Sequence, residues 1–344
     1  MLQGSSTFPA ESQAYFPMSR QEPISQLSKS GSVVVVIPCF RARSTIGHVL
    51  GGIGPEVARI YVIDDACPEH TGDWVNQNCT DSRVMVLRNA RNLGVGGAVK
   101  AGYQRALEES AAIVVKLDAD GQMDPKDIPL LIAPLLAGRA DYTKGNRFFD
   151  IEHVQQMPSM RLFGNAVLSL MTKLSTGYWD IFDPTNGYTA ITDTALRQLP
   201  LDKISGRYFF ETDMLFRLNT ARAVVADVPL PARYSGEISS LRIRLIIGEF
   251  LVKHVRNFMK RIIYNYYLRD MSIASIELPV GLVLSTFGFV YGAVKWMQAI
   301  GGTHPTPTGT VMLSVLPLLL GVQLLLAFLA FDIASVPRRP LSRP

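Results

Sequence analysis

Residues 113–122 read Ile-Val-Val-Lys-Leu-Asp-Ala-Asp-Gly-Gln, and this stretch decides the fold expected of the chain. It joins a short β-rich apolar run to two carboxylates that are separated by one small residue. In extended backbone, residues i and i+2 point to the same side, so Asp118 and Asp120 can face one divalent cation, and Gln122 can add a neutral oxygen ligand. Hard oxygen donors suit Mg²⁺ or Mn²⁺. A solvated acidic turn is the alternative, and the position directly after an apolar run argues against it.

Three more apolar runs of this kind precede residue 113, and each of the four is followed by a stretch with helical periodicity. Alternation of strands and helices predicts an α/β fold in which helices flank a mostly parallel sheet. The four predicted strands are Val33–Ile37, Ile60–Ile63, Val84–Leu87 and Ile113–Leu117.

Polar and conformationally special residues collect where these predicted strands end. Pro38 follows the first run, and Asp64 and Asp65 close the second. Residues 91–94 follow the third run, and residues 118–122 follow the fourth. Parallel sheets bind ligands beyond the carboxyl ends of their strands. We therefore expect one ligand crevice, lined by all four strand ends.

A glycine-rich run, Gly94-Val-Gly-Gly97, opens a predicted helix over 98–108. It is not a dinucleotide fingerprint, because Val99 stands where the third glycine would be and the run follows the third strand rather than the first. We interpret the run as a close backbone approach at a helix N-terminus, which can favour a nearby diphosphate.

The composition narrows the class of protein. Of the 344 residues 48% are hydrophobic and 18% are charged, which is too apolar for a disordered chain and too charged for a polytopic transporter. The net charge of +5 divides into −2 for the first 232 residues (22 basic, 24 acidic) and +7 for the remainder (12 basic, 5 acidic). A basic C-terminal part makes a membrane a better partner than nucleic acid, and no nucleic acid is expected.

The cysteines and the N-terminus predict a cytosolic location for the part that follows. Cys39, Cys67 and Cys79 have no metal-ligand spacing, and an odd number of cysteines argues against a secreted disulfide scaffold. The first 31 residues lack the apolar segment of a signal peptide, and we expect them to form a flexible tail.

Two long apolar segments near the C-terminus predict a membrane hairpin. The segments at about 278–300 and 311–331 each reach the length needed to cross a bilayer, and a Pro/Gly-containing turn at 301–309 separates them. Buried helices of a soluble core are the alternative. Basic residues lie before the first segment and after the second, so the positive-inside rule predicts that both flanks, and both chain termini, are cytosolic.

The segment 241–275 precedes the hairpin and contains a helical pattern with a basic face. Arg242, Glu249, Lys253, Arg256 and Lys260 share one predicted face. The predicted apolar face holds Ile243, Ile247, Phe250, Leu251, Phe258 and Ile262. A basic amphipathic helix before a span is typical of an interfacial helix on anionic headgroups, and an ordinary domain-packing helix is the alternative.

The expected domains are therefore a tail (1–31), a cytosolic α/β domain (32–240), a juxtamembrane helix (241–275), two spans (276–333) and a cytosolic tail (334–344).

Five spaced motifs follow one another along the predicted α/β part. They are Val-Ile-Pro-Cys-Phe (36–40), Val-Ile-Asp-Asp-Ala-Cys-Pro-Glu-His-Thr (62–71), Asn-Leu-Gly-Val-Gly-Gly-Ala-Val-Lys-Ala-Gly (92–102), Leu-Asp-Ala-Asp-Gly-Gln-Met-Asp-Pro (117–125) and Gly-Asn-Arg-Phe (145–148). In this order they resemble the inverting family 2 glycosyltransferases of the GT-A fold. A further segment, Val-Pro-Leu-Pro-Ala-Arg-Tyr-Ser-Gly-Glu (228–237), is similar to the branch that loads sugars onto polyprenyl phosphates, typified by dolichol-phosphate mannosyltransferase.

This resemblance implies a set of site residues. A divalent metal, Mg²⁺ or Mn²⁺, would be held on the diphosphate by Asp118, Asp120 and Gln122. The phosphate oxygens would meet Arg147, and the acceptor phosphate or the diphosphate would meet Arg233. The residues expected around the nucleotide are Pro38, Phe40, Asp64, Asp65, Asn92 and Gly94.

The chain also departs from the family pattern. Cys67 and Glu69 stand where the usual Asp-Asp-x-Ser-x-Asp series has Ser and Asp. After Gly-Glu, an extra Ile238 precedes Ser239 and Ser240, so a phosphate-binding lysine is missing there, and Arg242 or Arg244 could supply the charge. These departures leave the identity of the sugar open.

The segment Glu211-Thr-Asp213 lies where family members with hydroxyl acceptors keep a catalytic acid. Asp213 is therefore a candidate base or a group that orients the acceptor. A helix N-terminal acid that complements the helix dipole is an equally good interpretation.

The sequence thus predicts a membrane-anchored, metal-dependent glycosyltransferase. It would transfer one sugar from a UDP- or GDP-linked donor to a polyprenyl phosphate, and it could form a homo-oligomer. A phosphate acceptor is already anionic at neutral pH and needs no base. The alternatives are transfer to a hydroxyl of a lipid-linked saccharide, which needs one, and a catalytically silent nucleotide-binding membrane subunit. A Rossmann dehydrogenase is disfavoured because its fingerprint is missing after the first strand.

Overall fold

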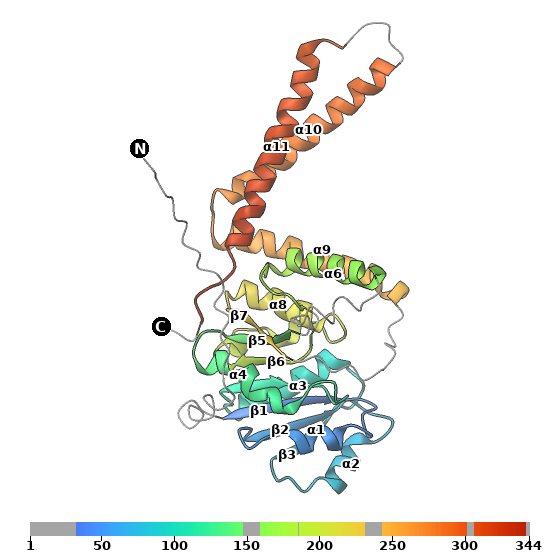
Figure 1. The fold of residues 1–344 in the computed structure, drawn as a ribbon, viewed down its shortest axis with the longest axis vertical. Helices are drawn as coiled ribbons and strands as arrows, with labels where there is room; N and C mark the ends of the chain where they lie inside the picture. The colour runs from blue at the N-terminus through green and yellow to red at the C-terminus, as the bar shows by residue number, and fades with distance from the viewer. Residues whose placement is uncertain (1–31, 147–158, 185, 231–242, 301–305, 342–344) are drawn as a thin grey trace, which may run out of the picture.

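The computed structural model describes residues 32–146, 159–184, 186–230, 243–300 and 306–341. Figure 1 shows an α/β part at one end, two helices lying across it, and a helical hairpin that projects away from both. The strands are β1 (Val33–Cys39), β2 (Arg59–Asp64), β3 (Val84–Arg88), β4 (Ile113–Lys116), β5 (Tyr142–Asn146), β6 (Thr189–Thr192) and β7 (Val225–Pro229). The helices are α1 (Ile46–Gly52), α2 (Thr71–Asn78), α3 (Val95–Glu108), α4 (Ile128–Leu136), α6 (Ser159–Thr176), α7 (Asp193–Arg197), α8 (Phe210–Thr220), α9 (Ile243–Ile263), α10 (Ala274–Ile300) and α11 (Thr308–Ala334), with short 3₁₀ turns η2 (Pro125–Asp127) and η3 (Leu201–Lys203) and the π-helical turn η4 (Tyr264–Arg269).

One mixed sheet forms the centre of the α/β part, with strand order β3-β2-β1-β4-β6-β5-β7. The four predicted strands are confirmed as β1 to β4, and they are mutually parallel. β6 is antiparallel to both of its neighbours, and β5 and β7 are parallel to each other. The expected mostly parallel α/β sheet is therefore confirmed, with β6 as its antiparallel strand.

The antiparallel direction of β6 matters for the site. Because Thr189 at the start of β6 pairs with Lys116 at the end of β4, the residues before β6 arrive at the same edge of the sheet as the carboxyl ends of the parallel strands. Lys144, near the end of β5, also pairs with Thr189. The described residues of loop 183–188 therefore join the edge of the predicted crevice from the other half of the sheet.

The core lies on both faces of the sheet. Side chains that alternate along β1 pack on opposite sides, so Val33, Val35 and Ile37 join one cluster with residues of α1 and α4. Val34 and Val36 join a second cluster with residues of α3, α7 and α8. Burial on both faces explains why the parallel strands have continuous apolar runs instead of alternating ones.

The hairpin consists of α10 and α11, which pack along each other (Figure 1). Both helices are long and apolar enough to cross a membrane, and only 11% of the most apolar window of each is buried, whereas a core helix of a soluble protein is mostly buried. Glycines let the two backbones approach: a Cβ at Gly288 would lie 2.7 Å from the carbonyl oxygen of Ser314, and one at Gly321 would lie 2.4 Å from the amide nitrogen of Ser285.

Helices α6 and α9 lie side by side between the hairpin and the sheet (Figure 1). The side of α9 that faces the α/β part is unusually polar, with His254, Asn257 and Arg261 buried. Of the residues predicted on the apolar face, Ile262 is buried and Leu251 is half exposed, so this face is divided between the protein and the outward side, and the interfacial role stays a prediction. The outward side of α9 carries Leu251, Val252, Val255, Met259 and Ile263. An exposed apolar stripe on a helix beside two candidate spans is typical of a membrane-facing surface.

Candidate active site

The carboxyl ends of four neighbouring strands meet at one edge of the sheet, as predicted. Cys39 of β1 pairs with Asp64 of β2, which in turn pairs with Arg88 of β3. On the other side of β1, Val36 pairs with Lys116 of β4, two residues before Asp118. The segments that follow β1, β2, β3 and β4 therefore lie along one edge of the sheet, which is where parallel sheets bind ligands and where the crevice is predicted.

Asp64 and Asp65 organise the loops of this crevice. Asp64 is buried and accepts hydrogen bonds from the backbone N–H groups of Cys67 (2.8 Å) and Gly72 (2.8 Å). Asp65 is also buried and accepts from the side chain of Asn89 (2.7 Å) and from the backbone of Leu93 (2.9 Å) and Gly94 (2.8 Å). Both carboxylates thus hold the chain that would surround a nucleoside, and a direct contact of either with the base or ribose stays a prediction.

Phe40 is the aromatic side chain at the mouth of the crevice. It follows the end of β1, its side chain is 44% exposed, and the guanidinium of Arg41 lies 5.5 Å from its ring centroid. Thr45 connects the same loop to the segment that follows β4, because its hydroxyl donates to the carbonyl oxygen of Ala119 at 2.6 Å. An exposed ring held at the end of a strand can stack on a planar base.

The glycine run makes a close backbone approach, as predicted. Its partner is another segment of the same chain, around Gly206. Gly94 has φ +78°, and a Cβ there would lie 2.7 Å from the carbonyl oxygen of Gly206. The N–H of Gly97 donates to that same oxygen at 3.0 Å. Asn92 accepts from the N–H of Gly94 at 3.1 Å. The run therefore packs α3 against the segment that leads into α8, and a diphosphate contact there stays a prediction.

A buried lysine, which the sequence analysis did not single out, connects two acids of the crevice. The side chain of Lys116 is 1% exposed, and its Nζ lies 2.9 Å from Asp118 Oδ1 and 3.3 Å from Glu211 Oε1. Burial alone would lower the pKa of Lys116, but the charges of Asp118 and Glu211 outweigh burial and raise that pKa. Lys116 therefore remains charged at neutral pH and holds the end of β4 to the start of α8.

The pair Asp118 and Asp120 has the donor chemistry for a divalent cation. Both residues and Gln122 are partly exposed, whereas Leu117 and Ala119 are buried. The backbone turns at residues 119–120 instead of remaining extended, so the placement of both carboxylates on one side stays a prediction. Asp120 Oδ1 accepts from the backbone N–H of Gln122 at 2.9 Å, which closes the turn. Within the described ranges no three His, Cys, Asp or Glu side chains form a ready metal cage. A cation here would need further oxygens from Gln122, water or a substrate.

Asp213 is enclosed by protein groups. Its Oδ2 accepts from the backbone N–H of Ser205 (2.9 Å) and from Arg217 Nε (3.3 Å), and its Oδ1 accepts from Asn257 Nδ2 of α9 (3.1 Å). These contacts give Asp213 a structural task at the start of α8, and the role as a base stays a prediction. Glu211 lies two residues earlier in the sequence. It is ion-paired with Lys116 and is therefore the acid of this motif that is linked to Asp118.

Buried charges continue beneath loop 183–188. Lys144 of β5 is buried and donates to the carbonyl oxygen of Asn186, and burial lowers its pKa to about 8. Asp227 of β7 accepts from the backbone N–H of Phe182 at 2.7 Å, and burial raises its pKa to about 6. A Cβ at Gly187 would lie 2.4 Å from Lys116 Nζ and 2.7 Å from Asp118 Oδ2, so only glycine lets this loop close over the pair.

Five predicted site residues lie outside the residues that the structure describes. They are Arg147, Arg233, Ser239, Ser240 and Arg242. In the sequence, Arg147 follows β5 and the other four residues follow β7. These two strands end at or near the edge of the sheet where the crevice is predicted.

Comparison with known proteins agrees with this geometry. The model of the family "Glycosyl transferase family 2" matches residues 34–199. An undecaprenyl-phosphate mannosyltransferase of Micrococcus luteus is 31% identical over 202 residues, which are 58% of this chain and 82% of that protein. A UDP-N-acetylglucosamine–dolichyl-phosphate N-acetylglucosaminyltransferase of Methanococcus voltae is 26% identical over 230 residues, covering 63% of this chain and 91% of that protein.

Solved structures share the fold. Glucosyl-3-phosphoglycerate synthase from Mycobacterium tuberculosis, in complex with Mn²⁺, UDP-glucose and phosphoglyceric acid, superposes with a TM-score of 0.53 at 19% identity, over 72% of this chain and 85% of that one. The same protein is also known with Mg²⁺ and UDP. The predicted GT-A nucleotide-sugar-binding fold is thus confirmed. By its motifs, its sheet and these relatives, the chain belongs to glycosyl transferase family 2.

Proposed function

We propose that this protein transfers a single sugar, with inversion, from a nucleotide sugar to a polyprenyl phosphate at the membrane surface. The relatives named for undecaprenyl-phosphate and dolichyl-phosphate substrates support the acceptor class. The observation that carries the proposal is the contact between the crevice and α9. Phe209, two residues before Glu211, packs edge-on against Phe250 (ring centroids 5.4 Å apart) and His254 (5.0 Å). The predicted crevice therefore lies next to the helix whose outer side exposes apolar residues together with Arg256 and Lys260.

The chemistry follows from the charge that develops during transfer. As the sugar leaves, negative charge grows on the diphosphate, and a divalent cation, when bound, would stabilise that charge. Asp118, Asp120 and Gln122 are the residues that would hold the cation. Lys116 neutralises part of the acidic cluster and fixes Asp118. A phosphate monoester has a second pKa of roughly 6, so the acceptor enters already ionised and needs no base.

The proposed residues divide the crevice into two sides. Phe40 and the loops held by Asp64 and Asp65 would surround the nucleoside, for which uridine and guanosine both remain candidates. Arg147 would meet the donor phosphates. Arg233, Ser239, Ser240 and Arg242 follow β7 and would meet the acceptor phosphate.

We further propose that the α/β part and both termini are cytosolic. Basic residues flank the hairpin on both sides of the sequence, as the positive-inside rule requires. The chain after α11 returns to the α/β part, where Arg222 Nη1 donates to the carbonyl oxygen of Ser335 at 2.9 Å and the N–H of Leu341 donates to Asp141 at 2.9 Å. Both ends of the hairpin therefore lie on one side of any membrane that it crosses.

The test incubates purified protein with a panel of UDP- and GDP-sugars, Mg²⁺ or Mn²⁺, and undecaprenyl or dolichyl phosphate. We expect one glycolipid whose mass equals polyprenyl phosphate plus one sugar. Replacing Asp118 and Asp120 together by Ala should abolish its formation, and a chelator should do the same to the native protein. Turnover that survives both treatments would overturn the metal role, and no glycolipid with any donor would favour a silent nucleotide-binding subunit.

A further inference from the structure

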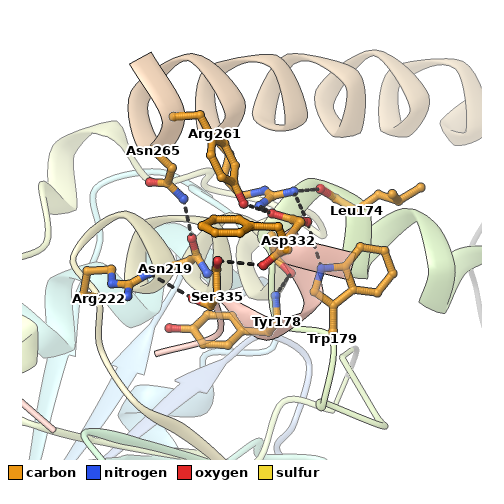
Figure 2. A network of polar contacts seen from close by, with 12 residues as sticks. Leu174, Tyr178, Trp179, Asn219, Arg222, Arg261, Asn265, Asp332 and Ser335 are labelled. Carbon is orange, nitrogen blue, oxygen red and sulfur yellow. Dashed lines mark hydrogen bonds and ion pairs between the residues drawn. The ribbon is translucent and has the colours of Figure 1, made fainter. Parts of the chain in front are cut away.

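A buried carboxylate at the foot of the hairpin accepts four hydrogen bonds. Asp332, in the last turn of α11, is 3% exposed. Its Oδ1 accepts from Arg261 Nη1 (2.6 Å) and Tyr266 Oη (2.5 Å). Its Oδ2 accepts from Arg261 Nη2 (3.0 Å) and Trp179 Nε1 (2.9 Å). Figure 2 shows Arg261 and Trp179 converging on Asp332 beneath α9. Every lone-pair position of this carboxylate is thus in use.

Arg261 extends the same contact to α6. Its Nη2 also donates to the carbonyl oxygen of Leu174, in the last turn of α6, at 2.8 Å (Figure 2). The turn after α6 needs a glycine for this arrangement, because Gly177 has φ +79° and a Cβ there would lie 2.8 Å from Arg261 Nη1. One buried ion pair therefore joins α6, α9 and the end of α11.

A second set of contacts ties the same junction to the far end of α8. Asn265 Nδ2 donates to Asn219 Oδ1 at 2.9 Å, and Arg269 Nη1 donates to the carbonyl oxygen of Thr220 at 2.9 Å. At the near end of α8, Asn257 holds Asp213. The segment formed by α9 and η4 therefore contacts α8 at both ends of that helix. At 1.5 Å per residue, Glu211 lies about 12 Å along α8 from Asn219, so one helix connects this junction with the edge of the sheet that carries Asp118.

A buried ion pair is weak evidence for added stability, because desolvation of the two charges offsets most of their attraction. Its stronger effect is geometric: a bidentate guanidinium–carboxylate pair accepts only one relative orientation of its two helices. Resting on the function proposed above, we propose that Arg261 and Asp332 are positioning residues that fix the height and tilt of the crevice relative to the membrane. They act on transfer to an acceptor that is embedded in a bilayer and not on the chemistry itself.

The test compares two acceptors in one set of variants. Arg261→Met combined with Asp332→Leu removes both charges and keeps most of the side-chain bulk, so neither charge is left buried alone. For this double variant in proteoliposomes we expect KM for undecaprenyl phosphate to rise at least tenfold with kcat kept. On a short-chain, freely diffusing prenyl phosphate, kcat/KM should stay within twofold of the native value. Equal losses on both acceptors, or no loss on either, would overturn the proposal.

A milder variant covers the case in which the double variant does not fold. Trp179→Phe removes one donor to Asp332, and we expect the same preferential loss on the bilayer acceptor, about two- to threefold. The matched control is Trp74→Phe, a half-buried tryptophan of α2 at the other end of the α/β part, which should affect both acceptors equally. The same effect of both substitutions on the ratio of the two activities would contradict the positioning role.

A third measurement needs no turnover, so it separates failure of this inference from failure of the proposed function. A spin label is attached at Phe182→Cys, an exposed position beside loop 183–188, and its distance to labelled lipid headgroups is measured in proteoliposomes. We expect the distance distribution to be narrow in the native background and broader or shifted when Arg261 and Asp332 are replaced. An unchanged distribution would show that the pair does not set the height of the crevice, whatever the substrate.

Discussion

The carbonyl oxygen of Gly206 occupies the space that a side chain on Gly94 would need. A Cβ at Gly94 would lie 2.7 Å from this oxygen, and Gly94 also has φ +78°. Both the steric conflict and the backbone conformation therefore demand glycine at a point where α3 meets the segment that leads into α8.

We expect Gly94→Ala to lower the free energy of unfolding by about 2 to 3 kcal/mol, because the new methyl group must displace Gly206 and the backbone is strained. Denaturant unfolding in detergent measures the change. Gly51→Ala is the matched control: Gly51 lies in α1 with nothing within 4 Å of the added Cβ, so stability should stay the same or rise by up to about 1 kcal/mol. Similar destabilisation by both substitutions would refute the packing argument.

Replacement of Lys116 by Met should alter metal and donor binding in opposite directions. Loss of the ammonium group leaves Asp118 and Glu211 without their shared cation, so we expect Mn²⁺ to bind about tenfold more tightly without nucleotide, while KM for the anionic donor rises about tenfold. Calorimetry with Mn²⁺ and steady-state kinetics test the two parts. Lys100→Met, which removes an ammonium group bonded to the carbonyl oxygen of Ile204, is the control and should change neither value by more than about twofold.

Asp213→Asn distinguishes a phosphate acceptor from a hydroxyl acceptor. Asp213 accepts from Ser205, Arg217 and Asn257, so we expect the substitution to lower the melting temperature. With a phosphate acceptor, kcat should fall by less than about tenfold, since no base is required. A loss of several orders of magnitude at unchanged folding would instead indicate a hydroxyl acceptor. Asp193→Asn, in a weak exposed pair with Arg197, should leave both quantities unchanged.

Acidification should weaken the docking of α9 through His254. This ring is buried against Phe209, and its Nδ1 lies 2.8 Å from Ser175 Oγ. Burial lowers the pKa of His254 from 6.5 to about 4. The unfolded chain therefore binds more protons than the folded one between these values, so stability is present above pH 6.5 and is lost as pH falls toward 4, by at most about 3 kcal/mol.

The measurement is the melting temperature of native protein and of His254→Gln from pH 7.5 to pH 4.5. Other carboxylates contribute to acid sensitivity in both proteins, so the difference between the two curves isolates His254. We expect that difference to shrink as the pH falls, because only the protein that retains His254 takes up a proton at this position when it unfolds. Parallel curves would show that His254 does not titrate during unfolding.

The sequence was sufficient for the parts of the fold that depend on regular apolar patterns. β1 to β4 are continuous apolar runs, and the two candidate spans are long uncharged ones, so each was predicted within a few residues. β5 was not predicted, because Tyr-Thr-Lys-Gly-Asn has no strand-like apolar pattern. Its Lys144 is buried through charged and polar neighbours that come from distant segments, which sequence spacing does not reveal.

The candidate site shows the same division. Asp118 and Asp120 were singled out because of their spacing after an apolar run, and their role at a metal stays a prediction. Lys116 and Glu211 are 95 residues apart, and their contact depends on how α8 packs on the end of β4. Helix α9 packs on protein with His254, Asn257 and Arg261, and this polar contact was not predicted, because hydrophobic periodicity does not reveal buried polar partners.

The contact of Leu341 with Asp141 sets an order on biosynthesis. Asp141 immediately precedes β5, in the middle of the α/β part, yet two of its hydrogen bonds come from the backbone of a residue 200 positions later. A ribosome makes that residue only after both hairpin helices have been synthesised. The α/β part therefore completes this contact last, once the two apolar helices are already part of the chain.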